Sequence, residues 1–94
     1  MIVTVDCSAY IRRQCSDFCH EIEVDEPCTV QDFIRILADR WGESFRATVF
    51  DESHNLRPII LLSLNESQIA WNRSVELHDG DRIALLSPIA GGLS

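Results

Sequence analysis

The sequence has 94 residues, which allows one domain with a modest core, because a chain of this size buries only about 60 to 65% of its unfolded surface. Hydrophobic residues make up 46% and charged residues 24%, which excludes collagen-like, coiled-coil and disordered classes. The net charge of −7 should repel phosphate backbones and anionic membranes, so neither nucleic acid nor a membrane is an expected partner.

The basic residues and the N-terminus restrict the chemistry and the location. All eight basic residues are arginines, so no lysine is present for Schiff-base chemistry or for accepting an isopeptide bond. The first residues lack a charged segment followed by an apolar one, and no apolar run approaches the roughly 18 residues that span a bilayer. We therefore expect a cytoplasmic protein, in which the four cysteines are reduced thiols.

The chain begins with a predicted hairpin. Residues 2–5 and 18–24 are β-branched or alternate between apolar and polar, as antiparallel strands with one buried face do. The connection is long and polar around Arg12 and Arg13, which predicts a mobile loop.

A helix is predicted after Pro27, where the hydrophobic period changes from 2 to 3.6. Thr29 is the expected N-cap, Asp32 complements the helix dipole, and Gly42 ends the helix. The apolar stripe, which should face the core, consists of Val30, Phe33, Ile34, Leu37, Ala38 and Trp41.

The second half predicts further strands with irregular connections. A polar turn at residues 51–55 precedes an apolar run of strand length at 59–64, in which Ile60, Leu62 and Leu64 form the row best suited to the core. An Asp79-Gly80 turn then leads into a last strand at 83–86. Strands, one main helix and more strands indicate an α+β domain in which the helix packs across one face of a mixed sheet.

The segment from Val75 to Gly92 contains the most specific pattern: a leucine, an Asp-Gly-Asp turn, a short apolar strand, Pro88 and a Gly-Gly pair. Together with the Met-Ile-Val-Thr-Val start and the Thr-Val-x-Asp-Phe helix start, it resembles the ubiquitin-like sulfur-carrier family, which includes the small subunit of molybdopterin synthase and the thiamine-pathway carrier. This resemblance implies a β-grasp domain over residues 1–87 and a flexible C-terminal tail over 88–94. Glu66 departs from the pattern, since many relatives have glycine there.

By the same resemblance, the carrier acts through its C-terminal carboxylate and not through a catalytic side chain. An E1-like adenylating enzyme that uses ATP and magnesium would activate Gly92, and a sulfur donor would convert the adenylate to a thiocarboxylate. The tail residues that enter a partner enzyme would be Pro88, Ile89, Ala90 and Gly91, because glycines fit a narrow channel and the proline stiffens the start of the tail. The carrier itself is expected to retain no cofactor and no metal.

Leu93 and Ser94 form the second departure, because they extend beyond the Gly-Gly pair. A peptide bond then stands where the reactive carboxylate is needed, so a protease has to act first. The resemblance implies a zinc-dependent JAMM-type peptidase, and it favours an acceptor enzyme that forms cysteine, homocysteine or another sulfur metabolite. The alternatives are the small subunit of molybdopterin synthase, a ubiquitin-like modifier conjugated through Gly92, and a binding module with a vestigial tail.

Partner docking is assigned to Leu86, with Arg12 or Arg13 assisting. Alternation in the last strand puts Ile83 and Leu85 on one face and leaves Leu86 on the other. In the family this position is an apolar contact with partner enzymes. The alternative is that another strand merely covers Leu86.

The remaining reactive residue types predict no site of their own. The cysteines contain no Cys-x-x-Cys pair, and on a strand Cys19 and His20 would point to opposite faces, which disfavours a zinc site. His54 and His78 lie in polar turns and are expected on the surface. Trp71 could cover the sheet edge or contact a partner, and the sequence leaves this open.

Overall fold

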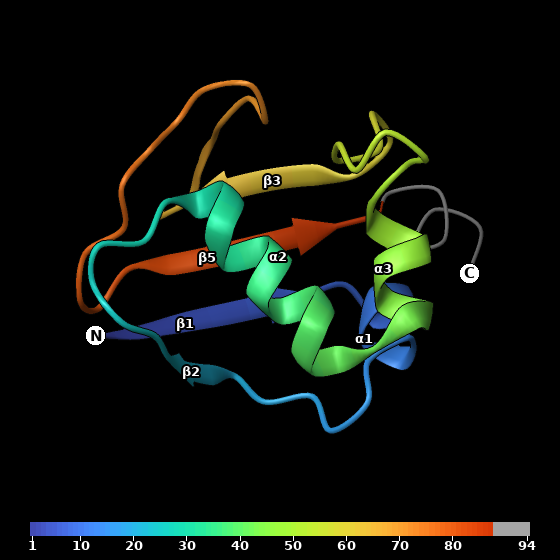
Figure 1. The fold of residues 1–94 in the computed structure, drawn as a ribbon, viewed down its shortest axis with the longest axis horizontal. Helices are drawn as coiled ribbons and strands as arrows, with labels where there is room; N and C mark the ends of the chain where they lie inside the picture. Colours follow the sequence, from blue (N-terminus) through green and yellow to red (C-terminus); the bar gives the residue numbers. More distant parts are fainter. Residues whose placement is uncertain (88–94) are drawn as a thin grey trace.

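A five-stranded mixed sheet with the longest helix across one of its faces makes up the fold (Figure 1). The computed structural model describes residues 1–87. None of the helices in this part of the chain is long and apolar enough to cross a membrane. The elements in chain order are β1 (Ile2–Cys7), α1 (Ala9–Arg13), β2 (Glu21–Glu23), α2 (Val30–Trp41), α3 (Glu43–Val49), β3 (Leu61–Leu64), β4 (Ser67–Gln68) and β5 (Arg82–Leu86).

The strand order is β2-β1-β5-β3-β4, so the last strand in the chain occupies the centre of the sheet. β5 runs parallel to β1 and antiparallel to β3, while β2 and β4 are the edge strands. The antiparallel pairing of β1 with β2 confirms the predicted opening hairpin. The predicted α+β arrangement of a mixed sheet beneath one main helix is likewise confirmed.

The predicted helix and its ends are confirmed in α2. The hydroxyl of Thr29 accepts a hydrogen bond from the amide of Asp32 at 3.1 Å, and Gly42 adopts a φ of 99° immediately after the helix. Every residue of the predicted apolar stripe is buried, and the Trp41 side chain has no exposed surface. The periodicity identified this helix because its whole stripe packs onto the sheet.

The connection between β1 and β2 differs from the prediction. It contains α1, a short helix that places Ile11 in the core, instead of a wholly irregular loop. The strand predicted over 18–24 is shorter, because β2 begins at Glu21. Phe18 packs against Trp41 with 5.0 Å between the ring centroids, so this residue joins the core through its aromatic ring and not through the sheet ladder.

The sequence reading also missed α3, which follows α2 directly. Only two of its side chains, Phe45 and Val49, are buried, so it lacks the long stripe that identifies an amphipathic helix. Gly42 links the two helices with a φ of 99° and a ψ of 179°, a backbone conformation that glycine adopts without steric cost. Arg46 of α3 then joins the two helices through a contact of 2.6 Å with Asp39 of α2, and it also contacts Glu43 of its own helix at 3.1 Å.

The second half keeps the predicted strands but changes their ends. β3 begins at Leu61, and the stretch after it, which was predicted as polar and irregular, contains the two-residue strand β4. The turn between β3 and β4 is made by Asn65 and Glu66, whose φ values are 51° and 73°. Two consecutive positive φ values are typical of the tight turns that match the twist of a hairpin.

Glu66 is expected to strain this turn. A residue with a Cβ, such as Glu66 at a φ of 73°, has a steric cost of about 1 to 2 kcal/mol in the left-handed region. Glycine avoids this cost, but it makes the unfolded chain more flexible, which offsets part of the gain in stability. Replacement Glu66→Gly should therefore raise the free energy of unfolding by about 0.5 to 1 kcal/mol, measured by urea denaturation. The matched control Glu66→Ala removes the same carboxylate but keeps a Cβ, so it should give no such gain. Equal stabilisation by both variants would assign the effect to charge.

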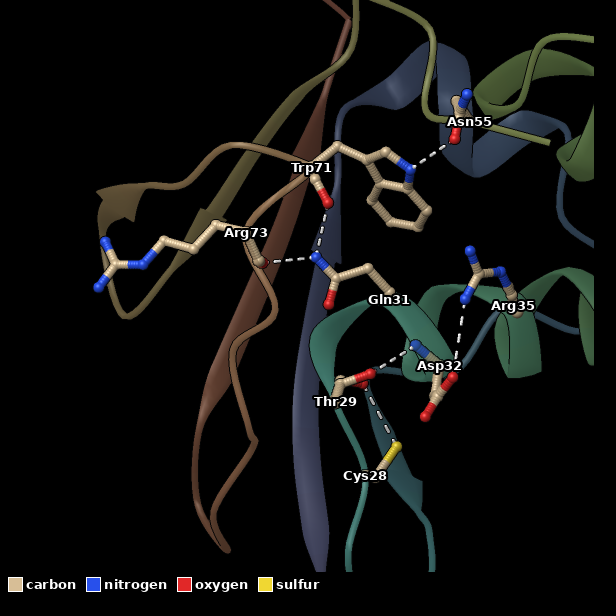
Figure 2. Close-up of polar contacts among 8 residues, drawn as sticks. All are labelled: Cys28, Thr29, Gln31, Asp32, Arg35, Asn55, Trp71 and Arg73. Carbon is tan, nitrogen blue, oxygen red and sulfur yellow. Dashed lines mark hydrogen bonds and ion pairs between the residues drawn. The ribbon is translucent and has the colours of Figure 1, made fainter. Parts of the chain in front are cut away.

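Gln31 holds the stretch after β4 against α2, as Figure 2 shows. Its side-chain amide donates hydrogen bonds to the carbonyls of Trp71 at 2.7 Å and Arg73 at 2.6 Å. The Trp71 ring packs against Phe50 with 5.6 Å between centroids and donates to Asn55 at 3.3 Å. Trp71 thus packs on the core beside α2 and is partly buried, and its contact with a partner stays a hypothesis.

Candidate functional site at the end of the central strand

The described part of the chain ends at Ser87, directly after β5 in the middle of the sheet, and the predicted tail follows this point in the sequence. Ser8, which follows β1, secures this point: its amide donates to the carbonyl of Leu85 at 3.0 Å, and its hydroxyl accepts from the amide of Ser87 at 3.1 Å. Ser87 is itself buried. The base of the tail is therefore fixed by the two central strands.

The open face of the sheet, opposite α2, carries an apolar pair at this same end. Leu86 of β5 and Leu61 of β3 are direct cross-strand partners, and their side chains are 43% and 37% exposed. Their neighbours Leu62 and Leu85 point to the other face and are buried, as the alternation predicted. No described element covers Leu86, so within residues 1–87 the covered-strand alternative does not hold.

Leu61 is the residue of this site that the sequence reading missed. The alternation at 59–64 assigns the core row to Ile60, Leu62 and Leu64 and gives Leu61 no role. Its cross-strand pairing with Leu86 arises from the register between β3 and β5, and no local pattern encodes that register.

The two arginines lie on α1, at the end of the sheet where β5 finishes (Figure 1). The guanidinium of Arg12 donates to the carbonyl of Cys7 at 3.2 Å and lies 5.2 Å from the centre of the Phe18 ring. Arg13 is exposed. Cys7 pairs with Leu85 in the sheet, so Arg12 is held close to the base of the tail.

The predicted tail lies outside the described residues. This applies to the insertion residues Pro88, Ile89, Ala90 and Gly91, to the reactive Gly92, and to the processing residues Leu93 and Ser94. The assignments at these positions stay predictions.

The buried thiols of Cys7 and Cys28 and the partly buried thiol of Cys15 are poorly suited to carry sulfur as nucleophiles. Burial raises the pKa of Cys7 to about 12 and that of Cys15 to about 11, and it also raises the pKa of Cys28. These thiols are protonated near neutral pH, whereas nucleophilic attack needs the thiolate. Cys19 is exposed and its thiol donates to the carbonyl of Glu21 at 3.2 Å.

The histidines and acidic residues do not gather into a metal site in the described chain. Residues 1–87 contain no group of three or more histidine, cysteine, aspartate or glutamate side chains that could hold a metal ion. His54 and His78 are exposed, as predicted. His20 contacts Asp6 at 3.4 Å, and its ring packs against Phe18 with 4.9 Å between centroids.

Solved structures with this fold cover nearly the whole chain. SAMP1 from Haloferax volcanii has a TM-score of 0.81 at 22% identity, covering 98% of this chain and 100% of that one. A putative molybdopterin converting factor, subunit 1, from Pyrococcus furiosus has a TM-score of 0.71 at 28% identity, covering 94% and 98%. A chain of the Amycolatopsis orientalis BexX/CysO complex has a TM-score of 0.70 at 22% identity, covering 90% and 93%. These likenesses confirm the ubiquitin-like β-grasp fold.

Among curated proteins, no sequence matches this chain significantly. The ThiS family, in contrast, matches residues 11–92, which is most of the chain and extends through both glycines of the tail. The matched residues therefore include β5, the exposed pair Leu61 and Leu86, and the segment that follows Ser87. The chain belongs to the ThiS family, a family of ubiquitin-like sulfur carriers and modifiers.

Proposed function

We propose that this protein carries sulfur as a thiocarboxylate on Gly92, after removal of Leu93 and Ser94. The observation that carries the proposal is the family match, which ends at Gly92 and leaves the last two residues outside the family pattern. The raised thiol pKa values of Cys7 and Cys15 support it as well, because they disfavour these side chains as carriers of the sulfur.

The proposed chemistry takes place on an adenylating enzyme. A peptidase of the JAMM zinc type first frees the Gly92 carboxylate. This carboxylate attacks the α-phosphorus of magnesium-bound ATP, and pyrophosphate leaves. A sulfide-level donor then attacks the acyl carbon, the bond to the AMP oxygen breaks, and the thiocarboxylate remains. An acceptor enzyme of sulfur metabolism, such as a cysteine- or homocysteine-forming synthase, takes up the sulfur.

The open face gives the adenylating enzyme a place to hold the carrier. Leu61 and Leu86 present an apolar contact beside the base of the tail, and Arg12 adds a positive charge at the same end. An exposed apolar pair bordered by polar groups is the kind of centre around which interfaces form. We assign docking to Leu86, assisted by Leu61 and Arg12 or Arg13.

An intact mass of the protein from its native cells, with peptide mapping under conditions that preserve thioacids, tests the proposal. The expected product has lost Leu-Ser and has one terminal oxygen replaced by sulfur. Persistence of the untrimmed chain during active sulfur metabolism would contradict the carrier role and favour a binding module.

The second candidate is the small subunit of molybdopterin synthase, which the 28% identity to the Pyrococcus furiosus protein favours. It predicts a stable complex with a large subunit, detectable by size-exclusion chromatography of the native protein. A modifier role, in contrast, predicts target peptides whose lysines bear the Gly-Gly remnant. Mass spectrometry of the same cells distinguishes these outcomes.

A further inference from the structure

A groove of about 590 Å³ lies between the segment that follows β2 and the exposed side of α2. It belongs to the edge of the sheet, whereas Leu61 and Leu86 lie on the more central strands β3 and β5. The proposed sulfur chemistry makes no use of it. The residues that line it are Glu23, Val24, Asp25, Pro27, Cys28, Asp32, Arg35, Ile36 and Asp39.

The groove has an apolar floor and an acidic rim. Val24 and Cys28 are almost fully buried, and Ile36 is half-buried, so aliphatic and thiol groups form the floor. The one arginine of the lining is already engaged: Arg35 contacts Asp32 at 3.6 Å, as Figure 2 shows, and stacks on the Trp71 ring at 5.4 Å. Asp39 is likewise paired with Arg46 at 2.6 Å, so the acids of the rim without an ion pair in the described chain are Glu23 and Asp25.

The outer edge of β2 offers backbone groups that pair with no other strand of residues 1–87. Backbone hydrogen bonds join Val5 to His20 and Met1 to Val24, so these are hydrogen-bonded pairs of the antiparallel β1/β2 ladder. In an antiparallel ladder the intervening residues direct their N–H and C=O groups to the opposite side. Glu21 and Glu23 thus direct their backbone groups to the free edge, where the carbonyl of Glu21 also accepts a hydrogen bond from the Cys19 thiol.

The charge of this edge decides between possible occupants. Residues 21–26 carry four acidic side chains, Glu21, Glu23, Asp25 and Glu26, and none of them forms an ion pair within the described chain. A second copy pairing edge to edge would bring two such rows together, which like charges oppose. A basic strand, in contrast, would be attracted to this edge.

We propose that the β2 edge and the groove form a docking site for an extended segment of a partner protein, in which aliphatic side chains alternate with arginine or lysine. Main-chain hydrogen bonds to Glu21 and Glu23 would add this segment to the sheet as a further strand. Because side chains alternate along a strand, the aliphatic ones lie on Val24 and Ile36 while the basic ones face the acids. The site does not depend on the chemistry at Gly92.

A synthetic strand tests the site on the full chain. The probe is the acetylated and amidated peptide Arg-Ile-Arg-Val-Arg-Ile-Arg, titrated into isotope-labelled protein and followed by amide NMR shifts. The expected shifts lie at residues 21–25 and along the groove side of α2 at 32–39. Methylation of alternate backbone nitrogens of the peptide should abolish binding, because it removes the donors that pair with β2.

Charge-reversal variants distinguish specific binding at the groove from a general attraction of a basic peptide to an acidic protein. The double variant Glu23→Arg with Asp25→Arg should weaken binding by about tenfold or more. The matched control, Glu52→Arg with Glu66→Arg, changes the net charge equally at exposed positions outside the groove lining and should change affinity by less than about twofold. Equal weakening by both variants, equal binding of a peptide with glycine at the aliphatic positions, or shifts centred on Leu61 and Leu86 would each overturn the proposal.

Discussion

The full chain with Leu93 and Ser94 is expected to give no adenylate, whereas the same chain ending at Gly92 is activated. The reason is covalent: in the longer chain the carbonyl of Gly92 belongs to a peptide bond and has no free oxygen that can attack ATP. The difference should be complete and not graded, because the reacting group itself is missing. It is measured by ATP-pyrophosphate exchange with the adenylating enzyme.

Two controls keep this experiment informative. A chain ending at Gly91 still has a glycine carboxylate but is one residue shorter, so the carboxylate falls short of ATP by up to about 3.3 to 3.6 Å and exchange should be strongly reduced. Adding the peptidase to the full chain should restore exchange. If the untreated full chain supports exchange as well as the chain ending at Gly92, activation does not require trimming and the proposed maturation step is wrong.

Replacement Leu86→Asp is expected to lower the specificity constant for activation by about 30-fold, which corresponds to about 2 kcal/mol lost at an interface anchor. A carboxylate in place of the exposed leucine would be buried without a partner when the adenylating enzyme covers the open face. The loss should appear mainly in KM, because Leu86 holds the carrier and does not touch the reacting atoms.

Ile2→Asp is the matched control for this variant. Ile2 is 46% exposed and lies on the same open face, but it begins β1, and since β1 and β5 are parallel it occupies the opposite end of the sheet. Both side chains are exposed, so both variants should keep the thermal midpoint of the wild type within a few degrees. Equal activation of Leu86→Asp and wild type would remove Leu86 from the docking surface, and equal losses in both variants would indicate a general charge effect.

Local sequence patterns determined the elements whose signals lie within a few residues of one another. The helix α2 could be predicted in full, with its cap at Thr29 and its stop at Gly42, because its 3.6-residue period and its end signals are all local. The faces of β5 followed in the same way, since alternation alone separates Leu85 from Leu86. The tail pattern up to Gly92 is a local signal as well, and the match to the ThiS family extends through it.

Only the tertiary structure decided what depends on contacts between distant residues. α1 and α3 are helical because Ile11, Phe45 and Val49 find places in the core, and such short segments carry too few apolar positions to show a period. The pairing of Leu61 with Leu86 and the groove beside β2 arise from strand register and from packing of α2 on the sheet. Register and packing are properties of the assembled sheet, so no single segment of the sequence contains them.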